Sequence, residues 1–138
     1  LDPIHAAALR IKLTKLDEWN DRRRAIAAYY NAALADCDGL TLPHVPAWAE
    51  PAWHLYVVQS EDRDRLAARL AEAGIQTLIH YPIPPHRQQA YAAMGLAEGS
   101  LPIAERLATR VLSLPIGPHL KQADAERVAE VVRAACTC

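Results

Sequence analysis

Cysteine and long apolar runs are both scarce in this chain of 138 residues, and each scarcity excludes a class of protein. The three cysteines, Cys37, Cys136 and Cys138, are an odd set that does not make a disulfide framework, so a reducing compartment is the simpler expectation. No apolar run approaches the roughly 18 residues that a membrane-spanning helix needs. The first residues do not resemble a signal peptide either. We therefore expect a soluble cytoplasmic protein without a membrane partner.

A strong excess of one charge is also lacking. The chain has 15 basic and 16 acidic side chains, for a net charge of −1, and the two signs are mixed along the sequence. No basic stripe with interleaved aromatic residues is present, so the charge pattern does not favour nucleic acid as a partner. The sequence contains no internal repeat or low-complexity segment. Its length is that of one domain of ordinary size, residues 1–138.

Metal-binding and hydrolase patterns are missing as well. Several histidines could suggest zinc, but they lack helical or short-loop spacing and have no acidic residues nearby; they are His54, His80, His86 and His119. Cys136 and Cys138 lack a second ligand pair and the usual two-residue spacer. No serine lies in the Gly-x-Ser-x-Gly context of a hydrolase nucleophile. We expect neither a metal site nor a nucleophilic serine.

Lysine is rare, with only Lys12, Lys15 and Lys121 in the chain. A lysine that forms a Schiff base needs a desolvated pocket or cationic neighbours that lower its pKa. Lys12 and Lys15 instead lie in a basic helical stretch, and Lys121 begins a polar helix. All three are expected at the solvated surface, so none is a candidate for covalent catalysis.

The first 38 residues predict an unusually long helical region. Pro3 suits a first helical turn, and apolar residues then recur at three- and four-residue spacing as far as Trp19. The pattern continues through Tyr30 to Gly39, with a bend expected near residues 14–17. Trp19 is expected in the core, together with Trp53 and Tyr56.

Residues 39–138 predict an α+β body. Its expected helices cover residues 62–73, 88–93, 101–110 and 124–135. Its expected strands cover residues 53–59, 75–79 and 111–114, whereas residues 40–52 contain three prolines and predict a loop. Gly74 suits the left-handed position that ends a helix. Short strands interleaved with helices indicate a small, mostly antiparallel sheet with helices on one face.

Residues 79–91, IHYPIPPHRQQAY, are the most informative segment. They place His80, Tyr81, His86 and Tyr91 around a turn stiffened by prolines, directly after an expected strand. A stiff loop that carries hydrogen-bonding rings at a strand end is a common place for ligand contacts. The local pattern is equally compatible with a capping turn that contains two satisfied histidines.

Four segments together carry a family resemblance. They are residues 1–30, WHLYVV at 53–58, IHYPIPPHRQQAY at 79–91 and VLSLPIGPHL at 111–120. In this order and spacing the chain resembles the C-terminal part of the DegT/DnrJ/EryC1/StrS nucleotide-sugar aminotransferases. Within that family it looks most like enzymes that aminate keto-deoxy sugars carried on a nucleotide diphosphate. His5 departs from the pattern, because glutamine is more usual there.

The resemblance implies the small C-terminal domain of a fold-type-I aminotransferase. Members of the family are considerably longer, with a large domain that holds pyridoxal phosphate on a lysine. Residues 1–38 would be the helix that connects the two domains. The chain starts at Leu1, where the family usually reads Asn-Ser-Arg-Leu-Asp, so we expect a fragment that lacks the large cofactor-binding domain. The chain alone would contain no catalytic residue and no cofactor ligand, and would be inactive.

The resemblance also implies roles for particular side chains. His80 and Tyr81 would hydrogen-bond sugar hydroxyls or the neighbouring phosphate. His86 and His54 are further substrate-binding candidates, although a satisfied core histidine would explain His54 equally well. The full enzyme would transfer an amino group, usually from glutamate, to a nucleotide-diphosphate keto sugar, and would be a homodimer. A family member that dehydrates the sugar, and a non-catalytic binding or dimerisation module, remain alternatives.

Overall fold

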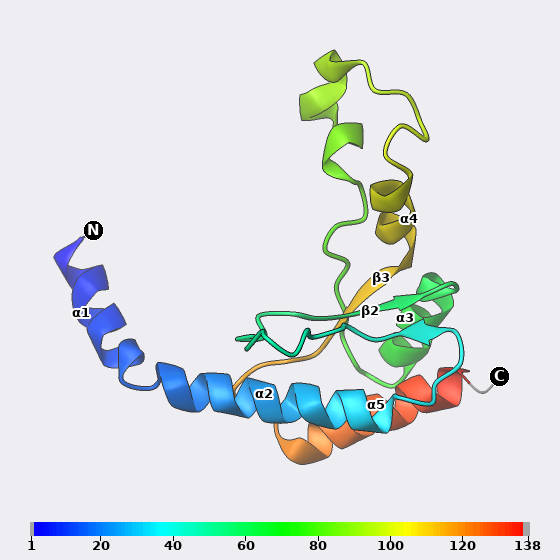
Figure 1. The fold of residues 1–138 in the computed structure, drawn as a ribbon. Helices are drawn as coiled ribbons and strands as arrows, with labels where there is room; N and C mark the ends of the chain where they lie inside the picture. Colours follow the sequence, from blue (N-terminus) through cyan, green and yellow to red (C-terminus); the bar gives the residue numbers. More distant parts are fainter. Residues whose placement is uncertain (1, 137–138) are drawn as a thin grey trace.

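The computed structural model describes residues 2–136, which form a small α+β body with two projections (Figure 1). The elements in chain order are α1 (Pro3–Leu13), α2 (Leu16–Ala33), β1 (Leu40–Thr41), β2 (Tyr56–Ser60), α3 (Arg63–Glu72), the 3₁₀ helices η1 (Pro85–Arg87) and η2 (Gln89–Met94), α4 (Pro102–Arg110), β3 (Val111–Leu114) and α5 (Gln122–Cys136). The strands form one antiparallel sheet in the order β1-β2-β3. Helices α2 and α5 lie side by side below it, and α3 packs against α5. The predicted fold class is therefore confirmed.

The N-terminal region is two helices joined by a short break. Asp2 begins α1 by accepting hydrogen bonds from the backbone N–H of Ile4 at 2.8 Å and of His5 at 3.4 Å, as an N-cap residue does. The break between Leu13 and Leu16 lies where the bend was predicted. Helix α1 has no buried residue, whereas α2 buries one face against the body.

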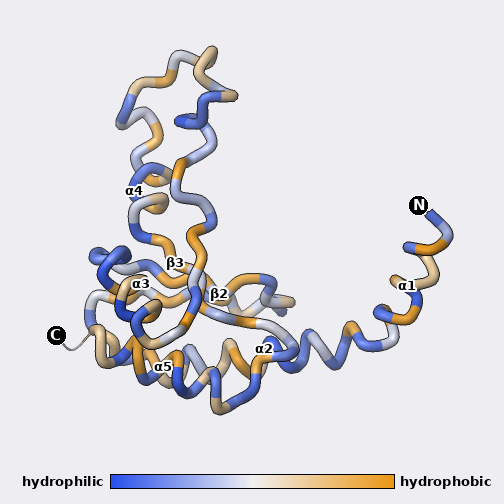
Figure 2. Tube along the Cα trace, turned by 180° about the vertical axis from the view of Figure 1, so that it is seen from behind, coloured by the Kyte–Doolittle hydropathy of each residue, from blue (hydrophilic) through white to orange (hydrophobic). Residues whose placement is uncertain are grey.

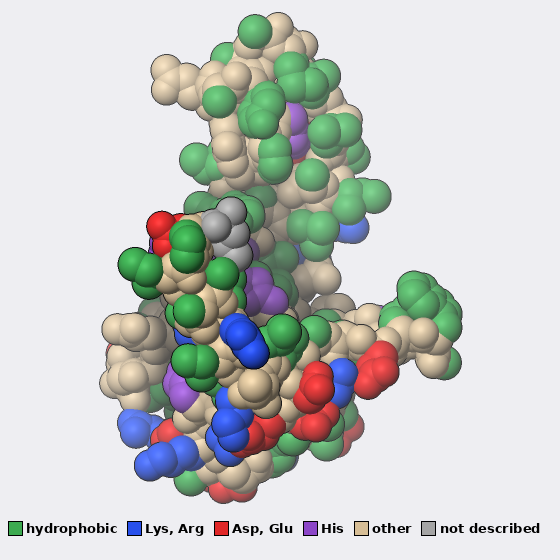
Figure 3. Space-filling view, turned by 90° about the vertical axis from the view of Figure 1, so that its left-hand side faces the viewer, with side chains coloured by type: hydrophobic (Ala, Val, Ile, Leu, Met, Phe, Trp, Pro, Cys, Tyr) green, Lys and Arg blue, Asp and Glu red, His purple; other side chains and the backbone are tan. Residues whose placement is uncertain are grey.

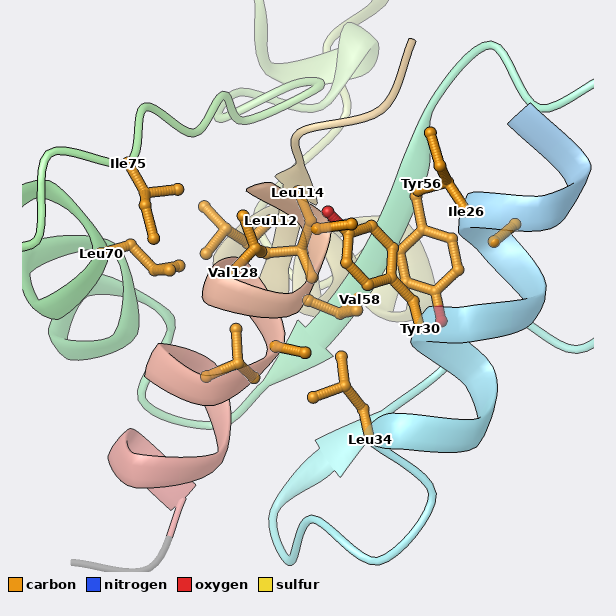
Figure 4. Packing of buried hydrophobic residues seen from close by; sticks show 14 of the residues in the cluster. Ile26, Tyr30, Leu34, Tyr56, Val58, Leu70, Ile75, Leu112, Leu114 and Val128 are labelled. Atoms are coloured by element: carbon orange, nitrogen blue, oxygen red, sulfur yellow. The ribbon is translucent and has the colours of Figure 1, made fainter. Parts of the chain in front are cut away.

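The core lies between the sheet and helices α2, α3 and α5 (Figure 4). Tyr30 of α2 and Tyr56 of β2 are fully buried, with ring centroids 5.0 Å apart. Their hydroxyls donate hydrogen bonds to Pro115 O at 2.9 Å and to Asn31 Oδ1 at 2.7 Å. Burial raises the pKa of both phenols, so both remain neutral donors.

Two predictions for the aromatic core hold and one is wrong. Tyr56 is buried, and Trp53 packs against it with a centroid separation of 5.5 Å. Trp19 is instead half-exposed and lines an apolar groove with residues of α1. It lies outside the core because the first turn of α2, next to α1, extends beyond the body.

The sheet differs from the prediction at its third strand. Strand β3 has the predicted bounds, and β2 is displaced by a few residues from 53–59. Residues 75–79 were expected to form a strand, but only Leu78 pairs, in a single bridge with Ser113. The chain then turns away from the sheet. The place of this expected strand in the sheet is taken by β1, Leu40–Thr41, in a stretch predicted to be a loop. It pairs with Ser60 and Gln59 of β2.

Helix α1 projects from the body in one direction, and residues 79–110 project in another (Figure 1). Residues 79–110 are here called the arm. Apolar positions recur along both (Figure 2), and hydrophobic side chains gather on the surface of the arm (Figure 3). Most of the large exposed apolar side chains belong to these two segments: Ile4, Leu9, Ile11 and Leu13 on α1, and Tyr81, Ile83, Tyr91, Met94, Leu96, Leu101 and Ile103 on the arm. Among the described residues no helix is long and apolar enough to cross a membrane.

Candidate functional site

The arm leaves the sheet beside β3, at a junction held by backbone hydrogen bonds. Ser113 N donates to Leu78 O at 2.8 Å, and Leu78 N donates to Ser113 O at 3.4 Å. Residues 78–81 and Ser113 are here called the neck. Because Pro82 follows shortly afterwards and favours neither a ladder nor a helix, the chain continues into the arm rather than along the sheet. The neck therefore fixes where the side chains after Leu78 lie.

His80 and Tyr81 form the polar part of the neck. His80 is half-buried, and its Nδ1 lies 2.8 Å from Ser113 Oγ. The His80 and Tyr81 rings meet edge to face, with centroids 5.7 Å apart and an angle of 78° between them. Tyr81 is 68% exposed. In this pair the His80 ring is held by its hydrogen bond to Ser113, and the Tyr81 ring faces solvent.

His86 occupies a different environment within the arm. Its side chain is 5% exposed, and its Nε2 lies 2.9 Å from Glu105 Oε1. Glu105 also accepts hydrogen bonds from the backbone N–H of Gly99 at 2.8 Å and of Leu101 at 3.4 Å. The hydrogen bond from His86, followed by that from Gly99, holds the pKa of this carboxyl below its usual range. Glu105 therefore ties η1, the turn before α4 and α4 together.

The structure does not gather the four predicted substrate-binding residues into one cluster. His54 is exposed and precedes β2, so the alternative of a buried core histidine within a strand is wrong. It lies outside the strand because β2 starts only at Tyr56. No hydrogen bond or ring contact among residues 2–136 joins His54, His80 and His86 to one another. Only His80 and Tyr81 are neighbours.

The lysines do not fit a pyridoxal phosphate site. Lys12, Lys15 and Lys121 are exposed, as predicted, and Lys15 pairs with Glu18 at 3.3 Å. None has the desolvated surroundings that a Schiff-base lysine needs. The described residues also contain no cluster of His, Cys, Asp or Glu that could hold a metal ion.

The two described cysteines are free thiols, and Cys136 is not suited to act as a nucleophile. Cys37 and Cys136 are half-buried. Burial, with a smaller contribution from Cys37, raises the pKa of Cys136 to about 11. A thiol with such a pKa is protonated near neutral pH and is a poor nucleophile. Cys138 lies outside the described residues.

A family model for the DegT/DnrJ/EryC1/StrS aminotransferase family matches residues 1–133. The chain belongs to this family. It is 52% identical over 134 residues to the erythromycin biosynthesis sensory transduction protein EryC1 of Saccharopolyspora erythraea, a match that covers 97% of this chain and 37% of that protein. It is 51% identical over 133 residues to the dTDP-3-amino-3,4,6-trideoxy-alpha-D-glucose transaminase of Streptomyces venezuelae, covering 96% of this chain and 35% of that protein.

Solved structures of aminotransferases have the same fold. The crystal structure of S. venezuelae DesV in complex with a ketimine intermediate covers 100% of this chain at a TM-score of 0.98 and 49% identity. A DegT DnrJ EryC1 StrS aminotransferase from Brucella abortus covers 100% at a TM-score of 0.91 and 40% identity. The chain spans 37% and 36% of those two chains. It therefore corresponds to about a third of these family members.

Two residues that organise the site have weak signals in the sequence. Ser113 is a lone polar residue between Leu112 and Leu114, and such a residue in a buried strand needs a hydrogen-bond partner. Nothing in the sequence indicates that the partner is His80. Glu105, in the first turn of α4, has the position of a residue that caps backbone N–H groups. Its bond to His86 has no local signature.

We expect Glu105→Gln to loosen the arm, because the amide removes the charge and one acceptor from a group that serves three donors. Protection of the Gly99 and Leu101 amides from hydrogen exchange should fall, after correction for intrinsic rates. Because folding lowers the pKa of the Glu105 carboxyl, its ionised form stabilises the fold fully at pH values above the ordinary pKa of 4.5. That stabilisation is lost as the pH falls through the lowered value, so wild-type protection should decrease below pH 4.5 and converge on that of the variant.

The matched control is Glu98→Gln. The Glu98 side chain is 86% exposed, and its ion pair with Arg87 is long, at 3.8 Å. The substitution should therefore leave the exchange pattern unchanged. Equal protection in Glu105→Gln and wild type at neutral pH would contradict the organising role of Glu105.

Proposed function

We propose that this chain is the C-terminal part of a pyridoxal phosphate-dependent aminotransferase that moves an amino group from glutamate to a nucleotide-linked keto-deoxy sugar. The observation that carries the proposal is 51% identity, over 96% of the chain, to a protein named as a dTDP-amino-sugar transaminase. The lysine and the cofactor site would lie in the part of the enzyme outside this chain. Residues 1–38 would connect the two domains.

Within that enzyme the neck would form the sugar side of the pocket. The held ring of His80 and the exposed hydroxyl of Tyr81 support this role, since both offer neutral hydrogen-bonding groups on apolar rings. They would bind hexose hydroxyls or the neighbouring phosphate. His86 was predicted to bind substrate, but its side chain is buried against Glu105, so we infer that it fixes the arm instead. Exposed His54 would contact substrate from another loop.

The exposed apolar surfaces support the placement in a larger assembly. An isolated domain rarely leaves this many large apolar side chains in water. We infer that the rest of the enzyme and a second subunit cover α1 and the arm in a cytoplasmic homodimer.

The proposal is tested with the full-length protein that contains this chain. Supplied with pyridoxal phosphate, glutamate and a dTDP-linked keto-deoxy sugar, it should form the amino sugar and 2-oxoglutarate, detected by mass spectrometry. Turnover of the sugar without incorporation of nitrogen from labelled glutamate would contradict amino transfer.

For Tyr81→Phe in that protein we expect a selective loss in the sugar half-reaction. The variant removes one hydroxyl and keeps the ring, so the loss should be about 0.5–1.5 kcal/mol for a neutral partner and up to about 3 kcal/mol for phosphate. The glutamate half-reaction, followed as conversion of bound cofactor to its amine form, should be less affected because glutamate lacks hexose and nucleotide.

Tyr91→Phe is the matched control, because Tyr91 is also exposed on the arm but lies away from the neck on η2. It should leave both half-reactions near wild type. Equal slowing of the two half-reactions in Tyr81→Phe would place Tyr81 in folding or cofactor positioning instead.

A further inference from the structure

The hydroxyl of Ser113 is buried and has a single described partner. Ser113 lies on β3 between two buried leucines and is 5% exposed. A buried hydroxyl hydrogen without an acceptor costs free energy comparable to a lost hydrogen bond. Among residues 2–136, the one hydrogen-bond partner of Ser113 Oγ is His80 Nδ1 at 2.8 Å. The hydroxyl is satisfied as a donor only when Nδ1 accepts.

This pairing determines which nitrogen of His80 carries the hydrogen. A neutral imidazole is protonated on one nitrogen and accepts on the other. With Nδ1 accepting from Ser113, the hydrogen resides on Nε2. No residue in the described part of the chain bonds Nε2, and the ring lies beside the exposed Tyr81.

We propose that Ser113 is a positioning residue that holds neutral His80 as the Nε2–H tautomer, so that His80 offers its ligand a hydrogen-bond donor. The ligand atom opposite Nε2 is then an acceptor. Resting on the proposed function, this atom is a hydroxyl, carbonyl or phosphate oxygen of the nucleotide-linked sugar, and a group that can only donate is rejected.

The geometry separates this role of Ser113 from its role in the fold. The backbone of Ser113 makes both hydrogen bonds to Leu78, and these hold the neck whatever the side chain is. The side chain contributes the bond to Nδ1 alone. Ser113→Ala therefore keeps the neck and releases the ring, whereas Ser113→Thr keeps a hydroxyl on the same carbon.

The tautomer is measured directly by two-bond ¹H–¹⁵N correlation spectra of the ¹⁵N-histidine-labelled 138-residue chain at about pH 8.5, roughly two units above the ordinary titration of imidazole. The His80 signals are assigned by their loss in His80→Gln. We expect a protonated Nε2 and an unprotonated Nδ1. A hydrogen on Nδ1, or averaging between both forms in the wild type, would overturn the proposal without any Ser113 variant.

The variants then test the assignment to Ser113. In Ser113→Ala the His80 signals should shift towards a tautomer average, and Ser113→Thr should restore the wild-type pattern. His86, bonded to Glu105, provides an internal reference whose signals should not change. An unchanged His80 pattern in Ser113→Ala, with the His86 signals intact, would show that another group sets the tautomer.

Kinetics of the full-length protein separate this proposal from the proposed function. Ser113→Ala should raise KM for the keto sugar by about three- to tenfold, the equivalent of one weakened neutral hydrogen bond, with Ser113→Thr near wild type and the glutamate half-reaction unchanged. If His80→Gln leaves the sugar half-reaction unchanged, the sugar site fails while the measured tautomer stands. If His80→Gln impairs that half-reaction and Ser113→Ala does not, the positioning role fails while the sugar site stands.

Discussion

Replacing Leu112 with alanine should lower the free energy of unfolding by about 2–5 kcal/mol, the range for removing a fully buried leucine from a packed core. Leu112 is 0% exposed on β3, next to the neck residue Ser113. The cavity would open between the sheet and the helices below it, where neighbours in several elements meet (Figure 4). Denaturant unfolding followed by circular dichroism measures the change.

Leu13→Ala is the control with the same chemical change. Leu13 is 68% exposed at the end of α1, so in dilute, monomeric protein its truncation should alter stability by less than about 0.5 kcal/mol. Similar losses in the two variants would mean that β3 does not belong to the cooperative core of this chain.

The isolated chain should self-associate through α1, and two charges on that helix should abolish the association. The side chains of Leu9, Leu13, Leu16 and Trp19 line an apolar groove of about 490 Å³ that no described residue covers. A contiguous apolar surface of this kind favours contacts between molecules. In sedimentation velocity at high concentration, Leu9→Glu with Leu13→Glu should shift the chain from oligomer to monomer.

The comparison variant is Ala25→Glu with Ala28→Glu, which adds the same two charges to exposed positions of α2. It should keep the association of the wild type. A wild-type chain that remains strictly monomeric at high concentration would contradict the prediction, as would equal dissociation by both double variants.

Local patterns predicted the elements whose signals lie within them. Strand β3 was found at its observed bounds because a short apolar run follows a helix and is stopped by Pro115. Helix α3 was found because Asp62 begins it and Gly74, at φ +75°, follows its end. Strand β1 was missed because two residues contain no periodicity, and their pairing depends on β2.

The candidate site was predictable only in its consecutive residues. His80 and Tyr81 are adjacent in the chain, so one segment revealed both. The partners Ser113 and Glu105 come from other elements, and tertiary packing alone brings them to His80 and His86. The projection of the arm could not be inferred either, because an apolar loop residue has the same pattern whether this chain or another covers it.

The bridge between Leu78 and Ser113 has a consequence for how related enzymes can diverge. The chain leaves the body after Leu78 and has returned to it by Ser113, and these two residues pair with each other (Figure 1). The arm is therefore an insertion between two adjacent points of the sheet. Changes in the length of such an insertion have a small entropic cost. This segment can therefore vary in length while the scaffold of sheet and helices is retained.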